Sequence, residues 1–328
     1  MSGVKCTSRI LSGILILALL LGLTGCGRTS YEIPYSVTGN FAPAVYGAEV
    51  NRAKTTPFAA DLCVVNGDVT KDSVNLESAG AAALFDLKNN EVICAKGVHE
   101  KMYPASLTKI MTAVVALEYG SMDQDLVATD NIKITESGAA TAKLNAGDHM
   151  TLDQALHILL LASANDVANL IAENIAGSID QFVALMNQKA VALGATNTHF
   201  VNTHGLTDLD HYTTAYDMYL IFNEAISHPE FTQIINMNSY QTTYYDKNGK
   251  PIQKEYATTN KFFKGQYEIP ENVTILGGKT GTTNAAGHCL ILLCKDVRGN
   301  SYIAVVMRCL NSDVLYAEMS DLLEEINK

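Results

Sequence analysis

Charged residues are scarce in this sequence, and the basic ones form no cluster. Only 17% of the 328 residues are charged, 48% are hydrophobic, and the formal net charge is −11. This composition argues against a disordered chain and is ample for the core of one large domain or two small ones. The lack of any run rich in Lys and Arg argues against a nucleic acid partner.

Cysteine pairs at metal-binding or redox spacing are also lacking. No CxxC occurs among the seven cysteines, and no spacing is typical of a zinc knuckle. Apart from Cys6 and Cys26 near the N-terminus, five cysteines remain, so at least one has no partner within the chain. We expect these five to be small buried side chains, with their disulfide state open: Cys63, Cys94, Cys289, Cys294 and Cys309.

No apolar run is long enough for a typical membrane span, but the chain begins with a shorter one. Residues 10–23 are mostly apolar and follow the basic residues Lys5 and Arg9, as in a secretory signal. The run ends in Leu23-Thr24-Gly25-Cys26, which resembles a bacterial lipoprotein box. We expect residues 1–25 to be a lipoprotein signal peptide and Cys26 to carry a lipid that anchors the protein, extracytoplasmically, to the membrane. An ordinary secretory signal with an incidental Cys26 is the alternative.

The remaining sequence divides into a linker and a domain of mixed helices and strands. Residues 26–57 contain scattered Gly, Ser, Thr and Pro with weak apolar periodicity, which predicts a tether. In residues 58–328, strand patterns lie near both ends and helical patterns lie between them, which predicts an α/β domain of two or three layers. The expected strands cover residues 79–86, 92–95, 275–281, 286–294 and 302–309, and the expected helices begin near residues 106, 151, 167, 178, 214 and 314.

Three short motifs contain candidate catalytic residues, of which the first is Ser106-Leu107-Thr108-Lys109. Positions i and i+3 lie on one face of a helix, so Ser106 and Lys109 can touch. A serine becomes a nucleophile when a base removes its proton, and lysine is such a base only when burial or positive neighbours keep it neutral. Alone, this spacing is common on helix surfaces and usually has no catalytic meaning.

The second and third motifs are equally weak alone. Ser163-Ala164-Asn165 lies between two helical patterns, where a hydroxyl could pass a proton and an amide could bind a carbonyl, or where both could simply cap a helix. Lys279-Thr280-Gly281 follows two glycines. A strand of this kind could carry Lys and Thr outward and accept a peptide as an added strand, or the segment could be a Gly-rich turn.

The ordered set is much more specific than its parts. The first two motifs lie 57 residues apart (163 − 106), and the second and third lie 116 apart (279 − 163), a pattern that resembles penicillin-binding proteins and serine β-lactamases. Flanking segments, among them Tyr103–Thr112, Leu161–Asp166 and Gly278–Gly287, resemble the D-alanyl-D-alanine carboxypeptidase family of low-mass penicillin-binding proteins.

The resemblance implies a fold, an activity and a set of partners. The fold would be an α/β, β-lactamase/transpeptidase-like domain, with an antiparallel sheet flanked by helices and a largely helical subdomain. The activity would be removal of the terminal D-alanine from peptidoglycan pentapeptides, and β-lactams would acylate the same serine. Neither a cofactor nor a metal is implied.

The resemblance also implies roles for individual residues. Ser106 would be the acylated nucleophile and Lys109 its base, while Ser163 and Lys279 would complete a proton relay. The backbone N–H groups of Ser106 and Thr282 would form the oxyanion hole. Further substrate-binding residues would be Asn165, Thr280, Gly281 and Thr282.

Two departures from the family pattern concern the end of the chain. The all-β domain that often follows the catalytic domain looks absent, so we expect none. Family members often place an arginine near the substrate carboxylate, after the strand that follows the KTG motif. Arg308 is the nearest candidate here, with Lys279 and the threonines as alternatives.

Three other functions are open to this sequence. A class A β-lactamase would need a glutamate in an ExxLN segment, and none occurs between Asn165 and Lys279. A zinc peptidase would need an arrangement such as HExxH, which His199, His204 and His211 do not form. A penicillin-sensing or wall-binding protein would share the fold but deacylate slowly, although the presence of every catalytic side chain argues against lost chemistry.

Overall fold

The computed structural model describes residues 59–328. The predicted signal peptide, the lipidation site at Cys26 and the whole predicted tether lie outside the described residues. Within the described part of the chain, no helix is both long and apolar enough to cross a membrane.

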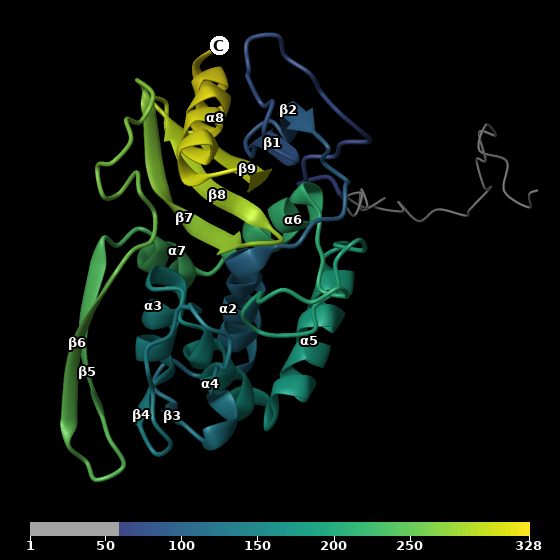
Figure 1. Ribbon diagram of the computed structural model, residues 1–328. Coiled ribbons are helices and arrows are strands. Elements are labelled where there is room, and N and C mark those ends of the chain that lie inside the picture. Colours follow the sequence, from purple (N-terminus) through teal and green to yellow (C-terminus); the bar gives the residue numbers. More distant parts are fainter. Residues whose placement is uncertain (1–58) are drawn as a thin grey trace, which may run out of the picture. The chain divides into compact units, whose positions relative to one another are not determined.

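A five-stranded antiparallel sheet lies at the upper end of the view in Figure 1. Its strands follow the order β2-β1-β9-β8-β7, so strands from both ends of the described chain meet in one sheet and β7 lies at its edge. The strands are β1 (Ala81–Asp86), β2 (Glu91–Lys96), β7 (Val273–Thr283), β8 (Gly287–Asp296) and β9 (Ser301–Cys309).

Both faces of this sheet are covered by helices. The side chains of successive residues in a strand point to opposite sides, so each strand contributes to both faces. Ala82 and Leu84 of β1 pack on one face against the C-terminal helix α8 (Ser312–Glu324). Ala83 and Phe85 pack on the other face, with the helices that precede β7 in the chain. This sandwich fixes β7, which contains the third motif, against the helical part of the molecule.

The helical part forms the centre and lower end of the view in Figure 1. Several helices begin at residues whose side chains cap the first turn: Thr151 forms a capping box with Gln154, and Ser178, Thr214 and Asn311 each accept a backbone N–H. The helices are η1 (Ala105–Leu107), α2 (Thr108–Tyr119), η2 (Asp130–Ile132), α3 (Leu152–Leu161), α4 (Asn165–Ala176), α5 (Ile179–Ala192), α6 (Ala215–Ala225), α7 (Pro229–Ile235) and η3 (Glu325–Asn327).

A second antiparallel sheet, which the sequence patterns did not predict, lies beside the helices. Its strand order is β3-β4-β5-β6. The hairpin of its last two strands extends as a long arm at the left of Figure 1. The strands are β3 (Asp125–Val127), β4 (His149–Thr151), β5 (Ser239–Tyr245) and β6 (Pro251–Ala257).

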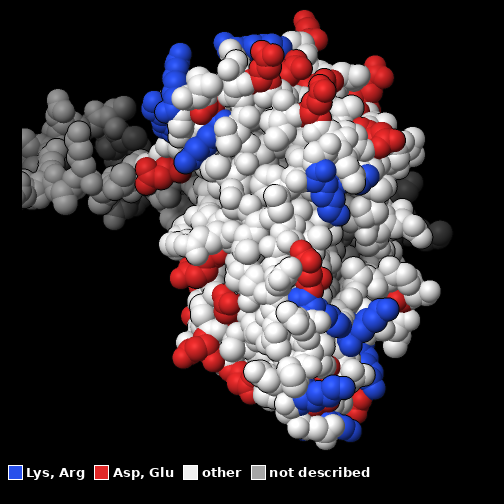
Figure 2. All heavy atoms as spheres, turned by 90° about the vertical axis from the view of Figure 1, so that its left-hand side faces the viewer, with Lys and Arg blue, Asp and Glu red and all other residues white. Residues whose placement is uncertain are grey.

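The predicted antiparallel sheet flanked by helices, with a largely helical region, is confirmed, while the predicted element list was incomplete. Besides the second sheet, it lacked α7. All five cysteines in the described residues are buried, as expected, and all five are unpaired, which the sequence had left open. On the face shown in Figure 2, acidic side chains lie along the upper right and left edges, and basic ones lie at the upper left and toward the lower right without merging into one continuous surface.

Candidate active site

The backbone around Ser106 is held in an unusual conformation. Ala105 has φ = 48°, a left-handed value that costs energy for any residue with a Cβ. Gly205 packs against it so closely that a Cβ there would lie 1.8 Å from the Ala105 carbonyl oxygen. The chain then turns into η1 and α2, which leaves Ser106 only half buried at the base of a cleft.

Lys109 lies one turn further along, is fully buried, and points its amine at Ser106. The Lys109 Nζ lies 3.0 Å from Ser106 Oγ, 2.6 Å from Asn165 Oδ1 and 2.7 Å from the His204 carbonyl oxygen. Burial, with the nearby Lys279 charge, holds the pKa of Lys109 well below that of an ordinary lysine, although Asp166 acts in the opposite sense. A neutral amine has two N–H groups and one lone pair. Because the Asn165 and His204 oxygens can only accept, the lone pair is left for the Ser106 hydroxyl.

Ser163 and Asn165 occupy the junction between α3 and α4. Ser163 has φ = 59°, and this turn lets the two residues face the same cleft. The capping interpretation of this motif is wrong: the N-cap of α4 is Ala164, which makes no side-chain cap. Asn165 is 3% exposed and bonds Lys109 instead, so the second motif contacts the first.

Lys279 approaches from β7, but its side chain is directed inward rather than outward as predicted. It is 1% exposed, and its Nζ donates to Ser163 Oγ at 2.9 Å and to the Thr280 carbonyl oxygen at 2.9 Å. Burial lowers the pKa of Lys279 to about 7. Thr280 and Thr282 lie on the other face of β7, as the period of a strand requires.

Gly281 allows β7 to approach the nucleophile. A Cβ at this position would lie 3.0 Å from the Ser106 nitrogen and 3.1 Å from the Pro104 carbonyl oxygen. The edge of β7 and the start of η1 therefore form two walls of a cleft of about 850 Å³ whose lining includes Ser106, Ser163, Asn165, Thr280 and Thr282. The three sequence motifs, which are far apart in the chain, thus meet at one place.

A comparison with family models matches residues 68–311 to the D-alanyl-D-alanine carboxypeptidase family, also called peptidase S11. The chain belongs to this family. The D-alanyl-D-alanine carboxypeptidase DacF of Bacillus subtilis (strain 168) is 31% identical over 268 residues, which are 78% of this chain and 64% of DacF. A D-alanyl-D-alanine endopeptidase of Escherichia coli (strain K12) is 27% identical over 76% of this chain and 77% of its own length.

The solved structures include relatives of the same fold. The crystal structure of the Streptomyces K15 DD-transpeptidase matches with a TM-score of 0.70 and 23% identity, over 78% of this chain and 98% of that protein. At this identity the likeness shows the fold alone. The chain spans 57–64% of the length of the carboxypeptidase relatives DacF, DacD of Salmonella typhimurium and DacC of Escherichia coli.

Arg308, the candidate for binding the substrate carboxylate, does not line the cleft. It is exposed at the end of β9. A Cβ at Gly80 would lie 3.0 Å from both Cβ and Cδ of Arg308, so the arginine stem runs over Gly80.

Two further residues hold the backbone of the site in place, and the sequence did not indicate either of them as a site residue. Asp166, 4% exposed, accepts N–H groups from Ala142 at 2.8 Å and Leu144 at 3.1 Å, and so fixes the loop that precedes β4 and borders the cleft. His211, 1% exposed, bonds Thr108 in the first turn of α2. Asp166 lies in a segment that resembles the family, whereas His211 was considered as a possible zinc ligand, and the partners of both lie far away in sequence.

The histidines considered for a zinc peptidase are used in other ways. His211 bonds Thr108 and Val201, and His204 Nδ1 accepts the Leu206 N–H at 3.2 Å. Burial lowers the pKa of His204 to about 3 and that of His211 to about 4. Both rings are therefore neutral and built into the loop that carries Gly205.

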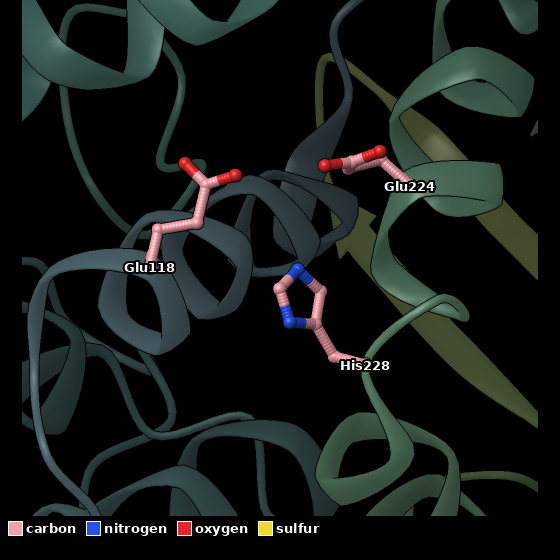
Figure 3. A group of neighbouring side chains, drawn as sticks. All are labelled: Glu118, Glu224 and His228. Carbon is pink, nitrogen blue, oxygen red and sulfur yellow. The ribbon is translucent and has the colours of Figure 1, made fainter.

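Residues 59–328 contain one group of three side chains that could together bind a metal ion, and it lies away from the cleft. Glu118, Glu224 and His228 come from α2, α6 and the start of α7, and their side chains face a common space (Figure 3). Lys189 of α5 forms ion pairs with both carboxylates, with Glu224 at 2.7 Å. An ammonium group therefore already offsets one of the two carboxylate charges of this group, which does not line the cleft.

Proposed function

We propose that this protein is a serine-type D-alanyl-D-alanine carboxypeptidase that removes the terminal D-alanine from peptidoglycan stem peptides through an acyl-enzyme on Ser106. The observation that carries the proposal is the position of the buried Lys109 amine, 3.0 Å from Ser106 Oγ. Its two other partners, the oxygens of Asn165 and His204, can only accept hydrogen bonds, so its lone pair faces the serine. Membership of the carboxypeptidase family supports the substrate class.

In the acylation step, Ser106 Oγ attacks the carbonyl carbon of the penultimate D-alanine as Lys109 Nζ takes its proton. The developing oxyanion accepts hydrogen bonds from the backbone N–H groups of Ser106 and Thr282, at the place where Gly281 lets β7 approach η1. The peptide C–N bond then breaks, and the leaving amine needs a proton. Ser163 passes on the proton that Lys109 took from Ser106, while Lys279 Nζ donates to the Ser163 oxygen at 2.9 Å, so the amine leaves protonated and Lys109 is neutral again.

In the deacylation step, water attacks the ester carbonyl and Lys109 again acts as the base, which releases the shortened peptide and regenerates Ser106. A β-lactam follows the same acylation path, but its leaving group remains attached after the ring opens. Asn165 fits a role in binding the substrate amide, since its side chain reaches the cleft while its oxygen is held by Lys109.

The proposed place of action is the outer face of the bacterial membrane. The support is the sequence of the first 26 residues, with a signal-like apolar run followed by Cys26. A diacylglycerol on Cys26 would anchor the catalytic domain near the cell wall without a spanning helix. A Cys26→Ala protein is expected to lose metabolic labelling with a fatty acid and to leave the membrane fraction, and retention of both would contradict the lipid anchor.

The activity is tested with the full-length protein and a diacylated Lys-D-Ala-D-Ala peptide, following released D-alanine. We expect release that disappears in a Ser106→Ala protein and after treatment with penicillin. Penicillin labelling of Ser106 without any release would indicate the sensing function instead. Release that survives Ser106→Ala would contradict the proposed mechanism.

A further inference from the structure

The cleft contains one ammonium group that the chemistry of acylation does not use. Lys261 is the sole Lys or Arg among the described residues that line the cleft. Lys109 and Lys279 are 0% and 1% exposed and lie beneath its floor, with their N–H groups already bonded inside the protein. A substrate anion in the cleft therefore meets Lys261 first.

The position of Lys261 is fixed by its neighbours on β7 and α8. Two residues earlier, Thr259 Oγ1 accepts a hydrogen bond from Thr280 Oγ1 at 2.6 Å, which holds this segment beside the KTG strand. The Lys261 backbone N–H donates to the Tyr316 hydroxyl at 2.8 Å, and its Nζ donates to Ser312 Oγ at 2.6 Å. The loop and the first turn of α8 thus direct the ammonium group at the cleft.

The charge of Lys261 has no acidic partner in residues 59–328. It forms no ion pair there, whereas Lys71, Lys133, Lys189 and Lys328 each pair with a carboxylate. One of its three N–H groups bonds Ser312, and two are free for a ligand. The ammonium group also lies 5.7 Å from the centre of the Tyr267 ring and 6.0 Å from that of the Tyr316 ring, contacts that attract a cation but leave room for an anionic ligand.

Lys261 also lies on the face of β7 that presents the threonines. Thr280 pairs across the sheet with Leu290, which belongs to the cluster under α8, so both threonines face α8. Thr282 pairs with His288, whose Nδ1 lies 3.2 Å from Thr282 Oγ1. Burial, with the Lys261 charge, lowers the pKa of His288, so this ring adds no positive charge at neutral pH.

These observations bear on how the cleft binds the anionic end of the substrate. The terminal carboxylate lies one residue, about 3.5 Å, beyond the scissile carbonyl group, and that carbonyl group faces Thr282 N–H in the proposed function. Arg308 is outside the cleft. We infer that Lys261 binds the C-terminal carboxylate of the substrate, assisted by the hydroxyl groups of Ser312 and Thr282, and so makes the enzyme select peptides with a free C-terminus. This inference rests on the proposed function.

The test compares two diacylated peptides, one ending in D-Ala-D-Ala and the other in its C-terminal amide. We expect the full-length protein to prefer the acid and Lys261→Gln to lose about 30-fold or more in kcat/KM for the acid, with little change for the amide. Lys261→Arg should recover most of the preference, because it keeps the charge. Lys264→Gln is the matched control: this exposed lysine of the same loop does not line the cleft.

A second readout separates this inference from the proposed activity. Acylation of Ser106 by a penicillin is measured with the free acid and with its methyl ester, which lacks the negative charge. Lys261→Gln should slow acylation by the acid and not by the ester, even if the wild-type protein releases no D-alanine. If Lys261→Gln keeps the wild-type acid preference with both pairs of ligands, the inference is wrong. Should Lys261→Gln fail to fold, Ser312→Ala replaces it, with a smaller loss expected on the acids alone.

Discussion

His211 Nε2 lies 2.8 Å from Thr108 Oγ1, and this bond links a histidine loop to the nucleophile. The His211 Nδ1 accepts the Val201 N–H at 3.1 Å, so Nδ1 carries no proton and Nε2–H is the donor. The Thr108 hydroxyl in turn donates to the Ala105 carbonyl oxygen at 2.8 Å. His211 thus stabilises the left-handed backbone of Ala105, although the two residues are 106 positions apart in the chain (211 − 105).

Removing this link is expected to slow acylation. His211→Ala removes the hydrogen bond that orients the Thr108 hydroxyl toward the Ala105 carbonyl oxygen, so Ala105 and the adjacent Ser106 can shift. A displacement of the nucleophile by about 1 Å can lower the rate about 100-fold. The rate constant for penicillin acylation and the Tm are measured together. His199→Ala, in the same loop but bonded to the Asp210 carbonyl oxygen, should acylate normally. Equal effects of both changes would contradict a positioning role for His211.

Acid is expected to destabilise the folded protein through its buried histidines. The pKa of His211 is about 4 and that of His204 about 3 in the folded protein, whereas in the unfolded chain both lie near 6.5. The unfolded state therefore binds more protons below pH 6.5. Each histidine lowers the free energy of unfolding by about 1.4 kcal/mol per pH unit from pH 6.5 down to its folded pKa. Urea unfolding of His211→Asn should show a smaller loss between pH 6.5 and 4.5 than the wild-type protein, and an identical loss would contradict this.

Lysine 109 has to be able to lose its proton. Lys109→Arg keeps a positive charge and a similar length, but arginine stays protonated at any working pH. We expect acylation of Ser106 to fall by about 100- to 10,000-fold. Stopped-flow measurement with a fluorescent penicillin reports this directly, and Lys264→Arg serves as the control. A loss below tenfold would indicate that another group is the base.

Gly205 is expected to tolerate no side chain. A methyl group there would collide with the Ala105 carbonyl oxygen, in addition to the strain of φ = 91°. Gly249 has a similar φ of 75° but nothing within 4 Å, so Gly249→Ala measures the backbone strain alone, about 1 kcal/mol. Gly205→Ala should destabilise the protein by at least about 2 kcal/mol more in thermal or urea unfolding. Equal effects of the two changes would show that the loop can move away.

Asp166→Asn is expected to loosen the loop beside the cleft. The carboxylate accepts the N–H groups of Ala142, Leu144 and Val167, and an amide replaces one of its accepting oxygens with a donor, at a cost of about 1–3 kcal/mol. We expect a lower Tm and a raised KM for the peptide. Asp180→Asn, in the first turn of α5, should change neither. An unchanged KM would mean that the loop does not contribute to substrate binding.

The sequence predicted well what depends on neighbours in the chain. The Ser106–Lys109 contact follows from i, i+3 spacing on a helix, and the capping box at Thr151 marks the start of α3 within a residue. The second sheet was missed although Asn248-Gly249 lies between its two long strands and is a turn signal. One face of that hairpin is buried or half-buried, but it includes the polar residues Thr242 and Lys254, so the apolar alternation that identifies a half-buried strand is weak there.

Contacts between distant segments could not be predicted from spacing. The bond from Lys109 to Asn165 joins residues 56 positions apart, and the inward direction of Lys279 depends on which face of β7 meets η1. Nothing in the residues around Lys261 indicated a site, because its placement depends on Tyr316 and Ser312 of α8. Tertiary packing, rather than local pattern, decided these positions.

The five buried cysteines give the catalytic domain an internal signal of its own unfolding. Burial raises the pKa of all five thiols, so in the native protein they are both enclosed and protonated: Cys63, Cys94, Cys289, Cys294 and Cys309. An alkylating reagent therefore reaches them only when the structure opens. Cys289 and Cys294 of β8 report opening of the sheet, and Cys63 reports release of the segment before β1. The order in which these thiols become labelled would reveal which part of the domain separates first.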